Sequence, residues 1–356
     1  MTGHVPPLSA SKTHCTSTPS GFPLCWRRSW HCIPTYTGRN RLSPMFDILL
    51  SIAPIFLLLV LGYWLRRGGI PSVEFWHLND RLVYWVLFPA LLFKNTSTIE
   101  LSGDLLSAFA VVIYAGFGSA VIFALVSSRL ARLDGATASS VLQGAARHNS
   151  FIALAVAERL IGAEGLALAA LVTALLIPVT NITVVTLMVL LIRGGGNLSV
   201  ALRAVLRDLV RNPLLIAVFL GIGANLLGAK SIPIVHDMVK ILGAAALPIM
   251  LLCVGANIRI RAMASAGLPV VLSVLGKQLV FPAVILVTAQ FVSVSDVALM
   301  VLIFYGAAPT AASAYTLARQ MGGNAPVMAT IITLQTAISF VSLPATVMLV
   351  QFMTQG

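Results

Sequence analysis

Charged residues are scarce in this sequence, and acidic residues are the scarcest. Only 10% of the 356 residues are charged, and just 11 residues are Asp or Glu, whereas soluble domains carry roughly 25% charged residues. Hydrophobic residues make up 58% of the chain, and its mean hydropathy is +0.95. This composition excludes an ordinary soluble domain and predicts an all-α integral membrane protein.

The positive charge of the chain does not indicate a nucleic-acid partner. Its net charge is +12, but the Lys and Arg residues lie in short loops between apolar runs, where membrane topology accounts for them. We therefore expect the lipid bilayer, and no nucleic acid, as the surrounding partner.

Motifs for catalysis and for metal binding are missing as well. The sequence has no nucleophile elbow, no HExxH, no P-loop GxxxxGK[ST] and no separate nucleotide-binding domain. Three of its four cysteines lie in the N-terminal tail and the fourth, Cys253, lies in an apolar run. The pairs His14-Cys15 and His31-Cys32 fit no standard zinc spacing. We expect no enzyme, no cofactor and no metal site.

Residues 1–44 lack an apolar run long enough for a signal peptide. They are rich in Ser, Thr, Pro, His and Cys, a composition that predicts a disordered tail. Met45 then opens MFDILLSIAPIFLLLVLGYWLRR, which is typical of the start of a membrane protein. Our hypothesis is that the tail comes from an upstream start codon and is absent from the working protein.

Long apolar runs fill the rest of the chain. Each is long enough to cross a hydrocarbon core of about 30 Å, and their Gly and Pro content favours helices over barrel strands. The longest loop, residues 193–211, predicts a short amphipathic surface helix. The ten predicted spans are residues 46–65, 75–93, 105–128, 137–160, 164–192, 212–229, 234–257, 267–292, 296–318 and 325–352.

The loop charges predict an orientation. One set of alternate loops carries Arg66, Arg67, Arg129, Arg132, Arg193, Arg203, Arg207, Arg211, Arg259, Arg261 and Arg319. The other set carries few cations and most of the acids. The positive-inside rule makes the first set cytoplasmic, so both ends of the ten-helix body lie outside the inner membrane.

Three short stretches recur at nearly constant offsets, which indicates an internal repeat. Each repeat has five spans, residues 45–192 and residues 212–352, so the second copy must be inserted upside down, as in secondary transporters. Pro89 and Pro248 are predicted hinges at matching positions. The pairs are Leu87–Leu92 with Ala246–Leu251, Gly144–Ala146 with Gly306–Ala308, and Ala157–Gly162 with Ala318–Gly323, at offsets of 159, 162 and 161 residues.

The fourth and ninth spans contain residues that are expensive in lipid. Arg147, His148 and Asn149 follow Gly144 in the fourth span, and Gly306 and Pro309 interrupt the ninth. Such residues face a protein interior or a water-filled cavity. Two interrupted spans at matching places predict broken helices around a binding site near the middle of the membrane.

These stretches resemble the auxin efflux carrier family, which includes the plant PIN carriers. The resemblance rests on the opening from Met45, on FPALLF at 88–93, on ARHNSF at 146–151 and on GAAPTAASAYTLARQMGG. It covers about residues 45–352. It implies ten helices in two inverted repeats, a fold like that of bile-acid and sodium/proton carriers, and broken helices that cross. It also implies a scaffold part, a transport part built from spans three to five and eight to ten, and organic anions such as auxin, malonate or malate as substrates.

One position departs from the family pattern. Many bacterial relatives have a proline a few residues after the asparagine of the first crossing helix, and Ala155 stands there in this chain. The fourth span thus lacks a helix breaker, whereas the ninth keeps one in Pro309.

Arg147, His148 and Asn149 are the first candidate site residues. Arg147 could hold a carboxylate through two parallel hydrogen bonds, or could cap backbone carbonyls at the break. His148 could carry a proton near neutral pH, or could be a neutral histidine bonded to a carbonyl. Asn149 stands where the family places its crossing asparagine, and could bind a carboxylate or satisfy the broken backbone.

The second half supplies further candidates. A break at Pro309 would expose the N–H groups and the positive end of a half-helix, with hydroxyls of Thr310 and Ser313 nearby, although a plain kink is the alternative. Lys277 in the eighth span could couple transport to protons or compensate substrate charge, or could snorkel to an interface. Asn181 could line the site or simply join helices.

The sequence as a whole favours a secondary transporter of a small organic carboxylate, working by alternating access. Export is implied by the family alone. The alternatives are a sodium-coupled uptake carrier of the bile-acid type, for which acidic ligands are scarce, and a membrane sensor without flux. The first, second, sixth and seventh spans are apolar enough to pair two copies as a homodimer.

Overall fold

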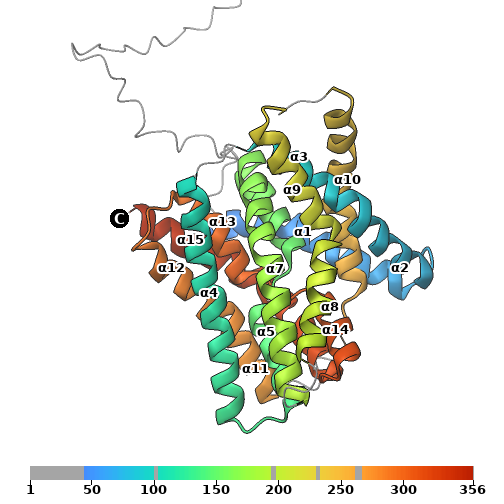
Figure 1. Ribbon diagram of the computed structural model, residues 1–356, viewed down its shortest axis with the longest axis vertical. Helices are drawn as coiled ribbons and strands as arrows, with labels where there is room; N and C mark the ends of the chain where they lie inside the picture. Colours follow the sequence, from blue (N-terminus) through green and yellow to red (C-terminus); the bar gives the residue numbers. More distant parts are fainter. Residues whose placement is uncertain (1–43, 100–102, 194–197, 230–232, 261–266, 356) are drawn as a thin grey trace, which may run out of the picture. The chain divides into compact units, whose positions relative to one another are not determined.

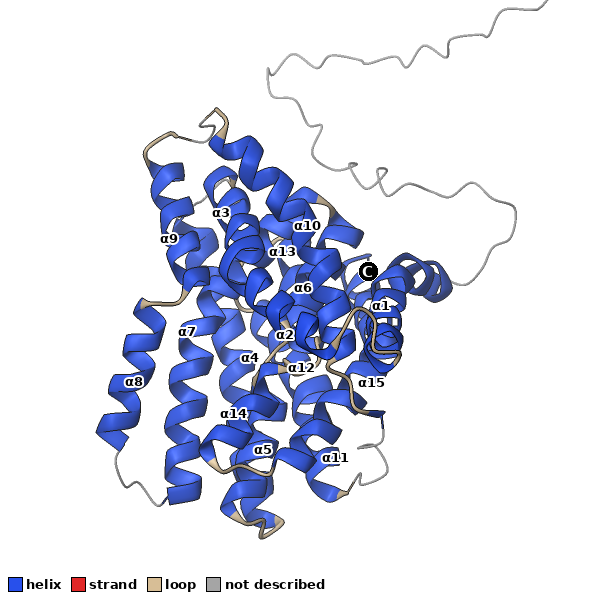
Figure 2. Cartoon of the chain, turned by 90° about the vertical axis from the view of Figure 1, so that its right-hand side faces the viewer, coloured by secondary structure: helices blue, strands red, loops and turns tan. Residues whose placement is uncertain are grey.

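The computed structural model describes residues 44–355 apart from 100–102, 194–197, 230–232 and 261–266. Every regular element in these ranges is helical (Figures 1 and 2). The predicted disordered tail up to residue 43, part of the loop 193–211 and Arg261 lie outside the described residues. The elements are α1 (Pro44–Arg67), α2 (Val73–Leu82), η1 (Val83–Leu87), α3 (Phe88–Thr98), α4 (Gly103–Leu130), α5 (Gly135–Ala146), α6 (Ser150–Ile161), α7 (Ala163–Arg193), α8 (Leu198–Val210), α9 (Pro213–Leu226), α10 (Val235–Ala256), α11 (Leu268–Leu275), η3 (Gly276–Val280), α12 (Phe281–Ala289), α13 (Asp296–Ala307), α14 (Ser313–Met321) and α15 (Ala325–Gln355).

Six helical stretches in the described residues are long and apolar enough to cross a membrane, or seven if the bent pair α8–α9 is one span. Three of the ten predicted spans are not among these stretches. Residues 75–93 fall on α2, η1 and α3, residues 137–160 on α5 and α6, and residues 296–318 on α13 and α14. The ten-span arrangement therefore stays a prediction.

Two π-helical segments, η1 and η3, share a sequence feature. Each is followed at once by a Phe-Pro pair, Phe88-Pro89 after η1 and Phe281-Pro282 after η3. A proline inside a helix has no N–H to donate and its ring crowds the preceding turn, and a π-helical turn accommodates that disruption without ending the helix. Pro248, by contrast, lies inside the continuous α10.

Glycines set the closest helix packing, between α1 and α10. A Cβ placed at Gly255 would lie 1.9 Å from the carbonyl oxygen of Leu59, and one at Gly62 would lie 2.0 Å from that of Leu252. α3 packs on α9 and α10, so α1, α3, α9 and α10 form one group. α4 packs on α5 and α12, and α5 packs on α7 and α11.

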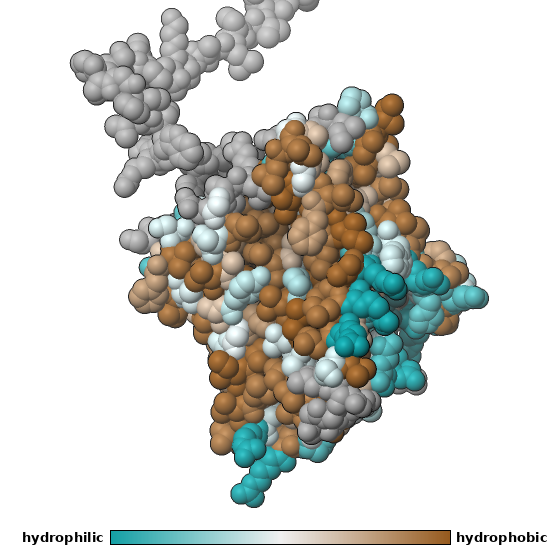
Figure 3. Space-filling view, viewed as in Figure 1, coloured by the Kyte–Doolittle hydropathy of each residue, from teal (hydrophilic) through white to brown (hydrophobic). Residues whose placement is uncertain are grey.

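The core centres on α13. Its residues from Ala298 to Ala307 are buried on every side, as expected for a helix that is apolar all round. Figure 2 shows α6 and α13 among the other helices. The outer surface is also apolar, with exposed side chains such as Leu57, Ile122 and Phe219, and Figure 3 shows hydrophobic residues over most of the visible face. Lipid contact accounts for such a surface.

The predicted surface helix in residues 193–211 is present as α8. It is amphipathic, with Arg203 and Arg207 exposed and Val205 buried. It turns by 49° into α9, where Asn212 accepts a hydrogen bond from the N–H of Leu214 and Pro213 opens the helix.

Candidate functional site

Two helices are interrupted in the core. α5 ends at Ala146 and α6 begins at Ser150, while α13 ends at Ala307 and α14 begins at Ser313. Gly144 and Gly306 lie in the last turns before these breaks. The fourth predicted span is broken although Ala155 replaces the family's proline, because Asn149 supplies a cap. Its side-chain oxygen accepts hydrogen bonds from the N–H groups of Phe151 and Ile152, which starts a new helix.

The two breaks contact each other directly. The N–H of Asn149 donates to the carbonyl of Pro309 at 2.7 Å, and the hydroxyl of Thr310 donates to the carbonyl of Gly144 at 2.7 Å. Gln335 on α15 connects the two breaks. Its amide oxygen accepts from the N–H of Thr310 at 2.9 Å, and its amide nitrogen donates to the carbonyl of Gly144 at 2.9 Å. Gln335 is fully buried, and it is not among the candidate site residues predicted from the sequence.

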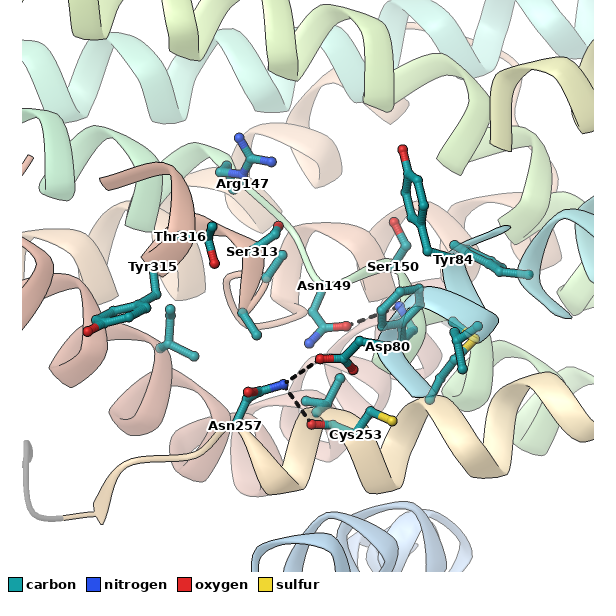
Figure 4. Close-up of a pocket in the computed structure, with 18 of the residues that line it drawn as sticks. Asp80, Tyr84, Arg147, Asn149, Ser150, Cys253, Asn257, Ser313, Tyr315 and Thr316 are labelled. Atoms are coloured by element: carbon teal, nitrogen blue, oxygen red, sulfur yellow. Dashed lines mark hydrogen bonds between the residues drawn. The ribbon is translucent and has the colours of Figure 1, made fainter. Parts of the chain in front are cut away.

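A cavity of about 660 Å³ lies beside the breaks (Figure 4). Arg147, His148 and Asn149 from the first break line it, as do Ala311, Ala312 and Ser313 from the second. Asn181 on α7 lines it as well. Pro309, Thr310 and Lys277 do not line the cavity in this structure. We call this space the crossing cavity.

The guanidinium of Arg147 is only partly satisfied. One terminal nitrogen, Nη2, donates to the side-chain oxygen of Asn181 at 3.3 Å. The other, Nη1, is buried and has no partner, and the buried hydroxyl of Thr180 next to Asn181 also has none. Buried donors without partners are expensive, so this wall of the crossing cavity is suited to an acceptor such as a carboxylate. Thr180 carries no signal in the sequence beyond its position beside Asn181.

The N-terminal ends of the two half-helices differ. Asn149 caps α6 with its own side chain, whereas α14 follows Ala312 and has no side-chain cap. The first N–H groups of a helix have no acceptor within that helix and carry its positive end. The N–H groups of Ala314 and Tyr315 donate to the carbonyls of Ala311 and Ala312, while Ser313 at this end lines the crossing cavity. What α14 offers to an anion is therefore the positive end of its dipole, which no side chain compensates.

Lys277 lies in η3 and is fully buried, so its side chain is not exposed at the surface of the protein. Its ammonium donates to the carbonyl of Tyr305 at 3.0 Å and lies 4.2 Å from the centre of the Phe281 ring. Tyr305 is in the last turn of α13, so the ammonium stabilises the negative end of that half-helix. The ring of His148 packs 5.5 Å from that of Tyr305, and its Nδ1 has no partner.

The opposite wall comes from α2, η1 and α10 (Figure 4). Asp80 is the one acidic residue that lines the crossing cavity, and it accepts a hydrogen bond of 3.4 Å from the side-chain amide of Asn257. Sequence reasoning missed Asp80, although an acid inside a predicted span is a signal for function. Among the described residues, no three His, Cys, Asp or Glu side chains group as a metal site would require.

Comparison with known proteins adds a family. A family model described as "Membrane transport protein" matches residues 47–347. A search of the curated proteins finds no match to this chain.

Proposed function

The chain belongs to the membrane transport protein family, which is the auxin efflux carrier family, and we propose from this premise that it carries a small organic carboxylate across the inner membrane by alternating access. It is an integral multi-pass membrane protein. The family supports a secondary transporter, and the charge distribution in the crossing cavity supports an anion as its cargo.

We also propose that the fold consists of ten spans in two inverted repeats, residues 45–192 and 212–352, with both ends outside. The order of the elements supports this. A broken helix stands fourth in each five-span series, α5 with α6 in the first and α13 with α14 in the second, and the two breaks are hydrogen-bonded to each other. Spans that are interrupted at matching places are typical of transporters.

One observation carries the proposed cargo: Arg147, whose buried Nη1 has no partner, and Ser313 at the end of α14 that has no side-chain cap both line the crossing cavity. A carboxylate there would accept from the guanidinium and from the hydroxyl of Ser313, near the positive end of α14, with Asn181 and Thr180 also lining the cavity. Planar guanidinium and carboxylate groups match in geometry. The volume of about 660 Å³ falls in the range of roughly 300–1,000 Å³ usual for small-molecule sites.

The two packing groups supply the parts for alternating access. α1, α3, α9 and α10 would form the scaffold, and α4 to α7 with α11 to α15 would form the moving part that holds the breaks. The crossing cavity lies between a wall from α2, η1 and α10 and a wall from the breaks, so a shift of one group against the other would expose the site to each side in turn. Lys277 and Gln335 would keep the breaks together during that movement.

The test is uptake of labelled carboxylates into inverted membrane vesicles from cells that express the full chain, with and without a proton gradient. We expect saturable uptake of at least one acid from a panel of malonate, malate and aromatic acetates. Arg147→Gln removes a charge-assisted hydrogen bond of about 1.5–3 kcal/mol, which corresponds to roughly a 10- to 100-fold rise in KM. Arg147→Lys should recover only part of that loss because an ammonium lacks the planar fork.

Arg203→Gln on the exposed face of α8 is the matched control, since it removes the same charge far along the chain from the breaks. Equal uptake by the parent and by folded Arg147→Gln, or no uptake of any acid by folded parent protein, would overturn the proposal.

A further inference from the structure

A second hollow adjoins the crossing cavity. Its volume is about 760 Å³, and three of the side chains that line it are arginines, Arg66, Arg67 and Arg259, while none of the described residues that line it is acidic. We call it the arginine groove. Arg66 and Arg67 end α1, and Arg259 follows α10. The positive-inside rule explains why arginines occur at such helix ends, but it does not predict that three of them share one concave site.

Neutral groups hold each of these guanidinium groups in place. Nη1 of Arg66 donates to the side-chain oxygen of Asn257 at 2.9 Å and to the carbonyl of Ala256 at 3.2 Å. Nη1 of Arg67 donates to the hydroxyl of Tyr63 at 2.8 Å. Each arginine therefore has a fixed position and keeps further N–H donors for another partner.

Arg259 is held in the same way, by Tyr315 on α14. Its Nη1 donates to the tyrosine hydroxyl at 2.9 Å, and its guanidinium lies 4.1 Å from the centre of the tyrosine ring. Among the described residues, the one ion pair within 4.0 Å is Arg207 with Asp208, at 3.8 Å. The three positive charges of the arginine groove are thus oriented without a described counter-charge in contact, an arrangement that attracts anions.

The groove and the crossing cavity share a wall. Asn257, Arg259 and Tyr315 line both hollows. Asn257 receives a hydrogen bond from Arg66 on the groove side and gives one to Asp80 on the cavity side. Arg259 follows α10 and Tyr315 lies on α14, so separation of these two contacting side chains would open part of the wall that the two hollows share.

We propose that the arginine groove is a second anion-binding site, which takes the carboxylate of the substrate before it reaches Arg147. The site itself rests on the three arginines, and only the identity of the anion rests on the proposed function. Positive charge in a concave site raises the local concentration of an anion and its rate of association, and this gain falls as salt rises. An anion in the groove would compete with Tyr315 for Arg259 and so would favour the opening of the shared wall.

The test is calorimetric titration of malonate into the purified full-length protein in a low-salt buffer with a zwitterionic sulfonate. The parent should bind two malonate ions. Arg66→Gln with Arg259→Gln should weaken one of these events at least 10-fold, and Arg147→Gln should weaken the other. Addition of 0.3 M KCl should weaken malonate binding in the arginine groove more than malonate binding at Arg147. Arg203→Gln should keep both malonate-binding events, and gel filtration should show that each variant is folded.

The outcomes separate the two proposals. Loss of an event in the double variant but none in Arg147→Gln keeps the arginine groove and removes the proposed inner site. Two unchanged events in the double variant, or no malonate binding by the parent up to millimolar concentrations, would overturn the groove. Binding of short-chain phosphatidylglycerol without malonate would also overturn it, because the groove would then be a lipid site.

Discussion

Gln335 is the residue whose replacement tests most directly how the crossing is held. It is fully buried on α15 and bonds to both breaks and to α11. Gln335→Leu keeps a side chain of similar size but removes every one of these hydrogen bonds. The N–H of Thr310 would lose its acceptor in the protein interior, while the carbonyl of Gly144 would keep the hydroxyl of Thr310 as a donor.

The magnitude follows from those bonds. One orphaned buried N–H costs about 1–3 kcal/mol, and each lost neutral hydrogen bond contributes about 0.5–1.5 kcal/mol net. With the bonds to Gly144 and Ser273 partly replaceable, we expect a loss of about 2–4 kcal/mol, or roughly 3–6 °C in apparent Tm for a chain of this length. The Tm of Gln335→Glu should lie between those of the parent and of Gln335→Leu, because glutamate keeps the acceptor for the N–H of Thr310 and loses the donor to the carbonyl of Gly144.

The assay is thermal unfolding of detergent-purified protein, followed by intrinsic fluorescence. Thr336→Val is the matched control, because Thr336 is a buried neighbour whose hydroxyl bonds only within its own helix, to the carbonyl of Ile332. We expect it to lower Tm by less than about one third of the Gln335→Leu effect, in line with one weak bond. If Gln335→Leu is as stable as Thr336→Val, the crossing does not depend on this side chain and our account of it is wrong.

Two further predictions concern helix packing and capping. Gly255→Ala should lower Tm by several degrees, because its Cβ would meet the backbone of Leu59 at 1.9 Å and overpacking costs about 1–3 kcal/mol, whereas Gly118→Ala, with open space around it, should not. Asp134 accepts from Thr137 and caps α5, and these hydrogen bonds lower the pKa of its carboxyl below 3.8. Asp134→Ala should therefore destabilise the protein by about 1 kcal/mol above that pH. Because the folded pKa is depressed, the difference from the parent should vanish as the pH falls through it, which unfolding scans at pH 3 and pH 6 would reveal.

The long helices could be predicted closely from the sequence. Residues 164–192 and 325–352 correspond to α7 (Ala163–Arg193) and α15 (Ala325–Gln355), because apolar length alone fixes where a span begins and ends. The π-helical segments could not be predicted in the same way. A Phe-Pro pair indicates a disturbance, but whether the helix ends, kinks or takes a π-turn depends on what packs against it.

The candidate site could be predicted on one side only. Arg147, Asn149 and Ser313 stand out because polar residues are rare in such spans, and they do line the crossing cavity. Asp80 and Asn257 are far from the breaks in sequence, and only tertiary packing brings them to the same cavity. The role of Gln335 could not be predicted for a related reason, since a single amide in a long apolar helix does not indicate which carbonyls it will contact.

The four half-helix ends at the crossing differ in how side chains of the protein compensate them. The carbonyl end of α5 receives donors from Thr310 and Gln335, and that of α13 receives the ammonium of Lys277. The amide end of α6 is capped by Asn149, whereas that of α14 has no side-chain cap. Side chains of the protein thus compensate both negative ends and one positive end, whereas the positive end of α14 is met only by the carbonyls of Ala311 and Ala312. Ser313 at that end and Arg147, whose Nη1 has no partner, line the same cavity. The anionic substrate proposed above would compensate that remaining positive end, and because it would bind only the folded crossing, it would raise the free energy of unfolding of the protein.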